Sequence, residues 1–334
     1  MLLLFPSSPL DLLNPGLDSE SESANTKLKN LSLVRKAFVP FCRPHIFKSV
    51  DILFDYGRSF PSLTELSGLI EKNPLLATYI TRVSCKFESP SSKSKDALSL
   101  PTLFNLPNVQ EFEIQKDGAG LDESDTLYYT DSDRALTWRK IFDHFIKRNL
   151  SKISISGMWN PPIFQLFSSP SLKTIELKGC MMQDTISLSA HPIPPNGFNV
   201  TRFVGSDLTG FPLSILSCCP RLEELDVVQI EPATGFSSLP EGQSFVPFRH
   251  LRSFTSNGDF DCSILCDSAR ASGLDIFPSL KELSISPVSE DEVPGVNTMF
   301  RFARSLNKLY FAVSLDCPKS GSVRVWALFG RTRT

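Results

Sequence analysis

A short apolar pattern that returns along most of the chain constrains the fold more than any other feature. It consists of an apolar residue, two variable residues, a second apolar residue, one variable residue and usually a third apolar residue. Its copies begin at Ile80, Val109, Leu150, Leu172, Val200, Leu222, Leu251, Leu280 and Leu306. Neighbouring copies start 22 to 41 residues apart. Such self-similarity predicts that the chain is built from repeated copies of one structural unit.

The residues around each copy indicate the local structure of that unit. Proline stands two residues before several copies, where it ends the preceding element and favours an extended entry. Amphipathic helices are predicted at residues 61–72, 134–147, 162–167, 213–217 and 298–304. Within the copies, apolar and polar residues alternate, which is typical of a strand with one buried face and one face open to water. The unit is therefore expected to be a helix followed by a short strand.

Two α/β architectures are compatible with such units. In an ordinary α/β domain helices cover both faces of the sheet, and its strands are usually apolar throughout. The alternating strands of this chain favour helices on one side of a curved parallel sheet. The copy formed by Leu172, Ile175, Leu177 and Cys180 resembles the full pattern of leucine-rich repeats. The resemblance implies an α/β, leucine-rich-repeat-like solenoid over residues 56–334, with residues 323–329 as a last edge strand.

The variable residues between the apolar ones, Ser84 among them, are expected to line the open face of the sheet. Six acidic and six basic side chains occupy these positions, so the face carries no single sign of charge. A balanced polar surface suits protein recognition better than binding of a nucleic acid or an anionic membrane. The residues predicted to contact an unknown protein substrate are Glu111, Glu113, Glu176, Lys178, Glu224, Asp226, Glu282, Lys308 and Tyr310. A solvated face without a partner is the alternative.

A second candidate surface lies near the amino terminus, before the first copy of the pattern. Leu31, Val34 and Phe38 follow a helical spacing and mark one apolar face of a short helix. Pro40 is expected to end that helix. Phe41 and Phe47 are then expected to pack a turn and a short strand against the rest of the chain.

These amino-terminal residues resemble a known family. The stretch LKNLSLVRKAFVP, followed by RPHIFKSV, is similar to the carboxy-terminal half of an F-box, as found before leucine-rich-repeat-like domains in fungal F-box proteins. The sequence departs from the family between residues 14 and 25, where a proline, a glycine and acidic serine-rich residues replace the expected apolar helix. Residues 1–55 are therefore interpreted as a degenerate F-box-like helical module that includes a disordered acidic segment.

The resemblance implies a function in protein degradation. An F-box docks a Skp-type adaptor and through it a cullin complex, so the chain would be the substrate-recognition subunit of an SCF-type cullin–RING ubiquitin ligase. The implied adaptor-binding residues are Leu31, Val34, Phe38, Phe41 and Phe47. One alternative is a helical cap that only seals the first repeat. The chain would then be a repeat-based interaction protein without ligase docking.

Composition and motifs argue against other classes of function. With 34 basic and 36 acidic residues the chain lacks the excess of positive charge that nucleic-acid binders carry. No run of 18 apolar residues predicts a membrane span. Eight scattered cysteines form neither a disulfide framework nor a zinc motif, which favours an intracellular protein, cytoplasmic or nuclear. No strained nucleophile turn or glycine-rich phosphate loop occurs, so we expect no enzyme activity, cofactor or metal.

Two segments carry further expectations. His144 is placed on the polar side of the helix predicted at residues 134–147. Residues 116–133 contain six acids and one lysine and account for the longest spacing between copies. With few apolar residues to bury, this segment is expected to be a mobile loop, either a plain solvated connection or part of a binding face.

Overall fold

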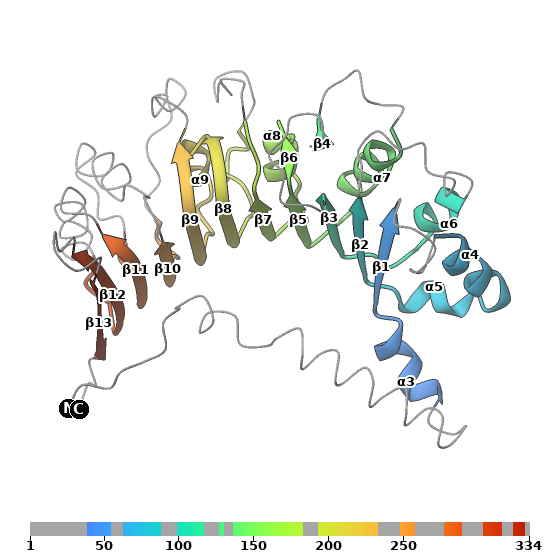
Figure 1. Cartoon of the computed structure of the whole chain (residues 1–334), viewed down its shortest axis with the longest axis horizontal. Coiled ribbons are helices and arrows are strands. Elements are labelled where there is room, and N and C mark those ends of the chain that lie inside the picture. Colours follow the sequence, from blue (N-terminus) through green and yellow to red (C-terminus); the bar gives the residue numbers. More distant parts are fainter. Residues whose placement is uncertain are drawn as a thin grey trace.

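The computed structural model describes residues 39–54, 63–87, 99–116, 127–129, 136–182, 193–232, 248–257, 277–288, 303–315 and 323–330. It is an α/β structure dominated by one 11-stranded sheet whose strands follow one another in the order of the sequence (Figure 1). Every neighbouring pair in this sheet is parallel except the last, which is antiparallel. The sequence-order arrangement follows from units that each add one strand beside the previous one.

The strands of the large sheet are β1 (Ser49–Phe54), β2 (Arg82–Phe87), β3 (Glu111–Lys116), β5 (Lys152–Ser156), β7 (Thr174–Lys178), β8 (Arg202–Phe211), β9 (Glu224–Pro232), β10 (Ser253–Asn257), β11 (Glu282–Val288), β12 (Lys308–Leu315) and β13 (Val323–Gly330). Each copy of the apolar pattern supplies one strand, from β2 to β12, as predicted. The expected last edge strand is also confirmed, as β13. β1, within residues 1–55, pairs with β2 as the first strand of the same sheet.

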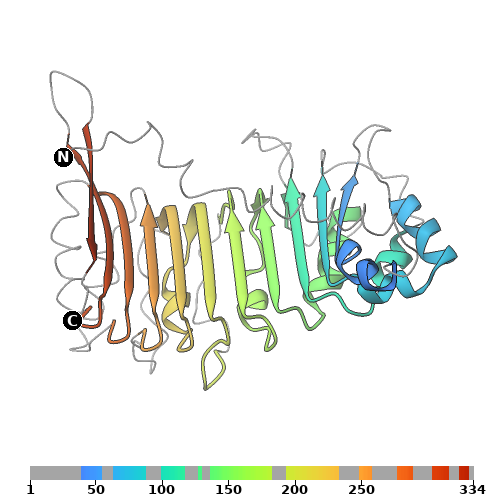
Figure 2. The ribbon, with the colours of Figure 1, turned by 90° about the horizontal axis from the view of Figure 1, so that it is seen from below.

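The described helices are α3 (Val39–Ile46), α4 (Leu63–Lys72), α5 (Leu75–Tyr79), α6 (Leu100–Phe104), α7 (Thr137–Ile146), α8 (Ile163–Phe167) and α9 (Ser214–Ser217). Seen from below, the strands lie in front of α7, α8 and α9, which therefore share one side of the sheet (Figure 2). The helices predicted at 61–72, 134–147, 162–167 and 213–217 are confirmed within two or three residues. Of the stretch 298–304, only residues 303 and 304 are described, and they lie in a turn.

The expectation that Pro40 ends a helix is wrong, because Pro40 lies within α3 (Val39–Ile46). The same helix also contains Pro44. The presence of a proline alone therefore does not mark the end of this helix.

The same hydrogen bonds join each unit to the next. The carbonyl oxygen of Lys48 accepts the N–H groups of Thr81, at 2.9 Å, and Arg82, at 3.0 Å. The equivalent carbonyl, just before or at the start of each later strand, accepts two consecutive N–H groups of the following unit; these carbonyls belong to Thr81, Gln110, Ser151, Lys173, Thr201, Glu223, Arg252 and Lys281. Identical joints explain why one short pattern serves along the whole sheet.

A backbone corner recurs just after β5 and β7 and within β8 and β9. Gly157, Gly179, Asp207 and Gln229 all have positive φ angles, from 50° to 67°. They follow register-aligned residues of β5, β7, β8 and β9. Beyond the corner that follows β5, β6 (Met158–Trp159) pairs in parallel with β4 (Leu127–Tyr128) in a second small sheet, and isolated bridges connect Trp159, Met181 and Thr209. In the units of β5, β7 and β8 the chain thus passes through the corner into a second ladder.

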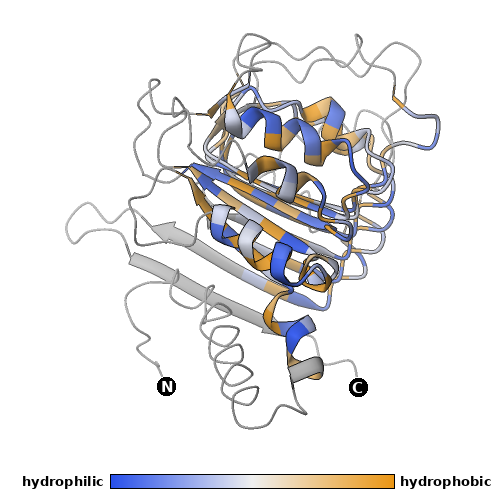
Figure 3. Ribbon diagram, turned by 90° about the vertical axis from the view of Figure 1, so that its right-hand side faces the viewer, coloured by the Kyte–Doolittle hydropathy of each residue, from blue (hydrophilic) through white to orange (hydrophobic). Residues whose placement is uncertain are grey.

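The core lies between the strands and the helices. Leu172, Ile175 and Leu177 of one unit, and Leu222, Leu225 and Val227 of another, are buried. Their strands β7 and β9 run parallel, with β8 between them. This confirms the predicted burial and parallel direction, although the two strands are not direct neighbours. Phenylalanine rings stack between units, for example Phe54 on Phe87 with centroids 4.5 Å apart. Figure 3 shows apolar and polar residues alternating along strands and helices, as expected from a sheet with one covered face.

One part of the acidic segment 116–133 is structured, contrary to the expectation of a mobile loop. Residues 127–129 are described, and Leu127 is fully buried where it pairs with Met158. The neighbouring Tyr129 packs edge-on against Phe142 of α7. The prediction rested on the acidic composition of the whole segment and overlooked this short apolar and aromatic stretch. Residues 117–126 and 130–135 lie outside the described residues.

None of the described helices combines the length and apolarity that crossing a bilayer requires.

Candidate functional site

The face of the large sheet opposite the helices, which we call the open face, carries every residue predicted to contact a substrate. Strand register arranges these residues in rows. A first row contains Arg82, Glu111, Lys152, Thr174, Arg202, Glu224, Ser253, Glu282 and Lys308. A central row contains Asp51, Ser84, Glu113, Ser154, Glu176, Val204, Asp226, Thr255, Ser284 and Tyr310. Lys178 lies in a third row, beside Ser156 and Ser206.

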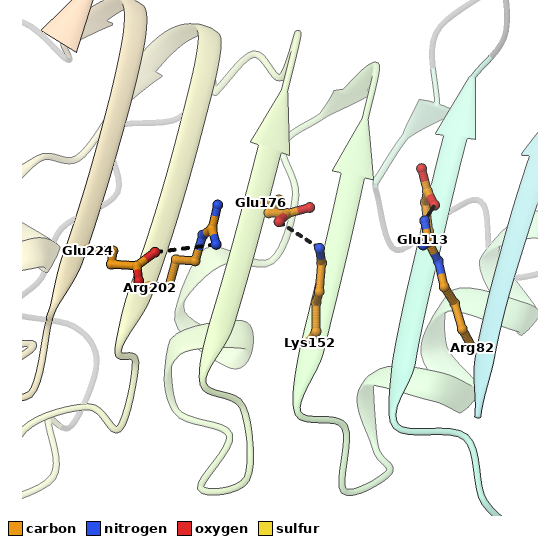
Figure 4. Close-up of polar contacts among 6 residues, drawn as sticks. All are labelled: Arg82, Glu113, Lys152, Glu176, Arg202 and Glu224. Carbon is orange, nitrogen blue, oxygen red and sulfur yellow. Dashed lines mark hydrogen bonds and ion pairs between the residues drawn. The ribbon is translucent and has the colours of Figure 1, made fainter. Parts of the chain in front are cut away.

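Cross-strand ion pairs neutralise most charges on the open face. Figure 4 shows three of these pairs, on neighbouring strands between β2 and β9. The pairs and their N···O distances are Arg82–Glu113 at 2.9 Å, Lys152–Glu176 at 2.7 Å, Arg202–Glu224 at 3.3 Å and Lys308–Glu282 at 2.6 Å. The first of these hydrogen bonds raises the pKa of the Arg82 guanidinium. These partly exposed pairs contribute little to stability, so their main effect is to leave few charges free for a partner.

Five charged residues of the open face have no ion pair among the described residues: Asp51, Lys86, Glu111, Lys178 and Asp226. Asp226 lies between Val204 and Thr255, its register partners, and is half-buried, as Lys86 and Glu111 also are. Burial raises the pKa of its carboxyl, and the nearby positive charge of Arg202 offsets this only in part. Asp226 is thus a partly desolvated acid, and the cation that acts on it, Arg202, is paired with Glu224.

The expectation that Ser84 is open to solvent is wrong. Only 1% of its surface is exposed. Its side-chain oxygen is enclosed and has no hydrogen-bond partner among the residues that the structure describes. A serine is short, and longer side chains such as Arg82 and Glu113 rise beside it on the same face. Alternation along the sequence predicts the face to which a side chain points, but not whether longer side chains on neighbouring strands cover it.

The amino-terminal end of the sheet presents apolar side chains to solvent. Phe41 of α3 is 74% exposed, whereas the adjacent Cys42 is buried. Phe47, just after this helix, is half-buried. Leu75 of α5 is 61% exposed and Leu69 of α4 is 49% exposed; sequence patterns did not single out either residue for a surface role. Leu31, Val34 and Phe38 lie outside the described residues.

Figures 1 and 2 both place α3, α4 and α5 at the β1 end of the sheet. Among the described residues, the only other large apolar side chain with such exposure is Tyr310, on β12. Leu75 and Leu76 open one short helix, and only Leu76 is buried. This doublet is a signal from which an outward-facing leucine could have been expected.

The cysteines in the described part of the chain are all buried. Burial raises the pKa of the thiols of Cys85, Cys218 and Cys219, and that of Cys180 to about 11. Such thiols are poor nucleophiles near neutral pH. The expectation that His144 lies on a polar helix side is wrong, because its ring stacks on Phe104 of α6 with centroids 4.3 Å apart. A helical wheel cannot show that a second helix covers this side.

Comparison with models of known protein families and with curated proteins finds no match to the chain.

Proposed function

We propose that this chain is the substrate-recognition subunit of an SCF-type cullin–RING ubiquitin ligase. In this proposal residues 1–55 form a degenerate F-box-like module that docks a Skp-type adaptor. Residues 56–334 form a leucine-rich-repeat-like solenoid whose open face holds a protein substrate. The chain is then a scaffold without a catalytic residue, and ubiquitin transfer takes place on other subunits.

The exposure of Phe41 is the observation that carries this proposal. A helix that only caps the first repeat would bury its large apolar side chains against that repeat. Phe41 is instead 74% exposed although its neighbour Cys42 is buried, so α3 is anchored on one side and presents an aromatic ring on the other. Exposed large apolar side chains gathered at one end of a protein are typical of an interface. Leu75 at the same end of the sheet adds to this apolar surface.

The repeated joints between units support the solenoid. The paired hydrogen bonds from each unit to the next recur from Lys48 to Lys281. Side chains add an equivalent set of bonds, in which Asn108, Asn199 and Ser305 donate to the carbonyl oxygens of Thr78, Pro170 and Pro278. Each donor precedes the first apolar residue of its unit. Stacked units with nearest-neighbour contacts are characteristic of solenoid proteins.

The alternative is a repeat-based interaction protein that has lost ligase docking. The specific observation in its favour is the missing apolar helix between residues 14 and 25, which an F-box would use for the adaptor. In that case the open face still binds a protein, and the exposed Phe41 belongs to another interface.

A binding measurement with a purified Skp-type adaptor tests the proposal. We expect the full-length chain to bind the adaptor at micromolar concentration or better, and Phe41→Asp to abolish binding while the melting temperature stays unchanged. Tyr310→Asp is the matched control, because it places the same charge at an exposed aromatic position near the opposite end of the sheet. An unmodified chain that does not bind the adaptor at micromolar concentration would overturn the ligase proposal.

A further inference from the structure

Charge pairing is incomplete in one part of the open face. On the first and central rows from β8 to β12, Arg202 pairs with Glu224 and Lys308 pairs with Glu282. Asp226 is the remaining charged residue of these rows, and it has no ion pair or hydrogen bond among the described residues. This stretch of the face therefore has one negative charge in excess.

The surroundings of Asp226 make that excess charge a binding feature. Its register partners are Val204 on β8 and Thr255 on β10, so no cation lies directly beside it on either strand. Its pKa is raised by burial, which means that the ionised carboxylate lacks the water that would stabilise it. A cation or hydrogen-bond donor from a partner would restore that stabilisation.

A second anchor lies in the same row. Register connects Asp226 to Thr255, then to Ser284 and to Tyr310. These steps cross three strand spacings, so the carboxylate and the aromatic ring are about 14 Å apart. Tyr310 is 44% exposed, and partly exposed tyrosines are among the residues that most often anchor a partner. Between the two anchors the row contains only hydroxyl side chains.

The neighbours of Tyr310 select what can bind on its ring. Lys308 lies two residues earlier on the same strand, and its ammonium group is already paired with Glu282 at 2.6 Å. No unpaired acid of the first and central rows therefore lies beside Tyr310 to hold a second cation from the partner. An aliphatic side chain needs no such acid and buries apolar area on the ring.

We propose that the central row from Asp226 to Tyr310 binds an extended protein segment that crosses the strands, with a lysine or arginine against Asp226 and an aliphatic side chain on Tyr310. An extended chain advances about 3.3 Å per residue, so these two side chains are four residues apart in the bound segment. The proposal rests on the proposed function of the open face as a substrate-binding surface and gives that substrate a chemical class.

Selection of a phage library of random dodecapeptides on the full-length chain tests the proposal. We expect the recovered peptides to carry a basic residue four positions from an aliphatic one. For such a peptide, Asp226→Asn is expected to weaken binding by at least about tenfold, because it removes one partner of a desolvated charge pair. Tyr310→Ala is expected to weaken it by about fivefold, since it deletes an anchor of the interface. Asp51→Asn is the matched control, because Asp51 is an exposed acid of the same row on β1 that is not among the predicted substrate-contact residues, and it is expected to change nothing.

Two outcomes overturn the inference. One is a library that yields no peptide, or peptides without the basic and aliphatic spacing. The other is a peptide affinity that neither Asp226→Asn nor Tyr310→Ala weakens. Adaptor binding by the same variants separates this test from the proposed function: a chain that binds the adaptor but shows either outcome loses only the present inference. A chain that fails to bind the adaptor but whose peptides depend on Asp226 keeps the inference as a property of an interaction protein without ligase docking.

Discussion

The guanidinium carbon of Arg139 lies 3.2 Å from the centre of the Tyr129 ring. Arg139 belongs to α7, and Tyr129 belongs to the acidic segment inserted before that helix. Asp143, one turn later, accepts hydrogen bonds from Arg139, at 2.9 Å, and from the Tyr129 hydroxyl, at 3.3 Å. The three side chains form one network that fastens the inserted segment to the helix layer.

Replacing Tyr129 separates the two contributions of this network. Tyr129→Leu removes the cation–π contact with a nearly buried guanidinium and is expected to cost about 2 kcal/mol of unfolding free energy. Tyr129→Phe keeps the ring and loses only the hydroxyl, so it is expected to cost about 1 kcal/mol. Chemical denaturation of the purified variants measures both values. Equal costs for the two variants would show that the ring does not interact with Arg139.

Core packing offers a second test. Leu225 lies on β9 and is buried, whereas Val228 of the same strand is only half-buried. Leu225→Ala is expected to destabilise the chain by about 2 to 5 kcal/mol, because it removes buried apolar atoms and leaves a cavity. Val228→Ala is the control and is expected to cost less than about 1 kcal/mol, since less apolar area is lost. The melting temperatures of the two variants test this expectation. A lower melting temperature for Val228→Ala than for Leu225→Ala would mean that the core lies on the other face of β9.

Two residues with positive φ angles, Gly210 of β8 and Gln229 of β9, predict opposite effects of substitution. A Cβ on Gly210 would lie 2.1 Å from the carbonyl oxygen of Met182, and the φ angle of Gly210 is 70°. Gly210→Ala is therefore expected to cost about 3 kcal/mol through strain and displacement of the neighbouring backbone. Gln229 has a φ of 50° without being glycine, so Gln229→Gly is expected to stabilise by about 0.5 kcal/mol. Thermal unfolding of the two variants, whose melting temperatures should shift in opposite directions, checks these backbone conformations.

The sequence could predict the strands but only part of the surfaces. Strand positions from β2 to β12 follow from local alternation, and helices such as α7 follow from local spacing, so both are visible in short windows. Contacts between distant segments have no such local signal. The burial of Ser84 depends on neighbours in other strands, and the stacking of His144 depends on α6, more than 35 residues away. The positive φ of Gln229 belongs to the backbone, and its side chain gives no indication of it.

Which face of α3 meets solvent was also beyond local reasoning. Phe41 and Cys42 are neighbouring apolar residues, and one of them is exposed while the other is buried. The helix was expected to end at Pro40, which would have placed both residues in a turn. In the structure both residues belong to α3, and helical geometry sends consecutive side chains in directions about 100° apart. Only one of two such residues can then face the core.

Thiol chemistry tests the burial of the described cysteines. Cys180 and Cys219 are buried, and burial raises the pKa of both thiols. Because the thiolate is the reactive form, neither residue is expected to react with iodoacetamide at pH 7.5 in the folded chain. Mass spectrometry of labelled peptides measures the extent of reaction. Both residues should react fully in denaturant, and rapid labelling of either one without denaturant would contradict the packing of α9 and β7 against the core.

His144 predicts how stability changes with pH. Its ring stacks on Phe104 and meets Phe145 edge-on, and its Nε2 atom is buried without a hydrogen-bond partner. Desolvation, followed by the positive charge of Arg148, lowers the pKa of the imidazole below its ordinary value near 6.5. The unfolded chain therefore binds more protons at this residue between the two pKa values, so stability rises with pH across that window. The contribution of His144 is fully present above about pH 6.5 and is lost as the pH falls through the lower pKa of the folded state.

Denaturation of the unmodified chain between pH 5 and pH 8 is expected to show this decline in stability at acid pH. His144→Gln, which cannot titrate, should flatten it, whereas the exposed His250→Gln should retain it. A slope that survives in His144→Gln would assign the proton uptake to another group.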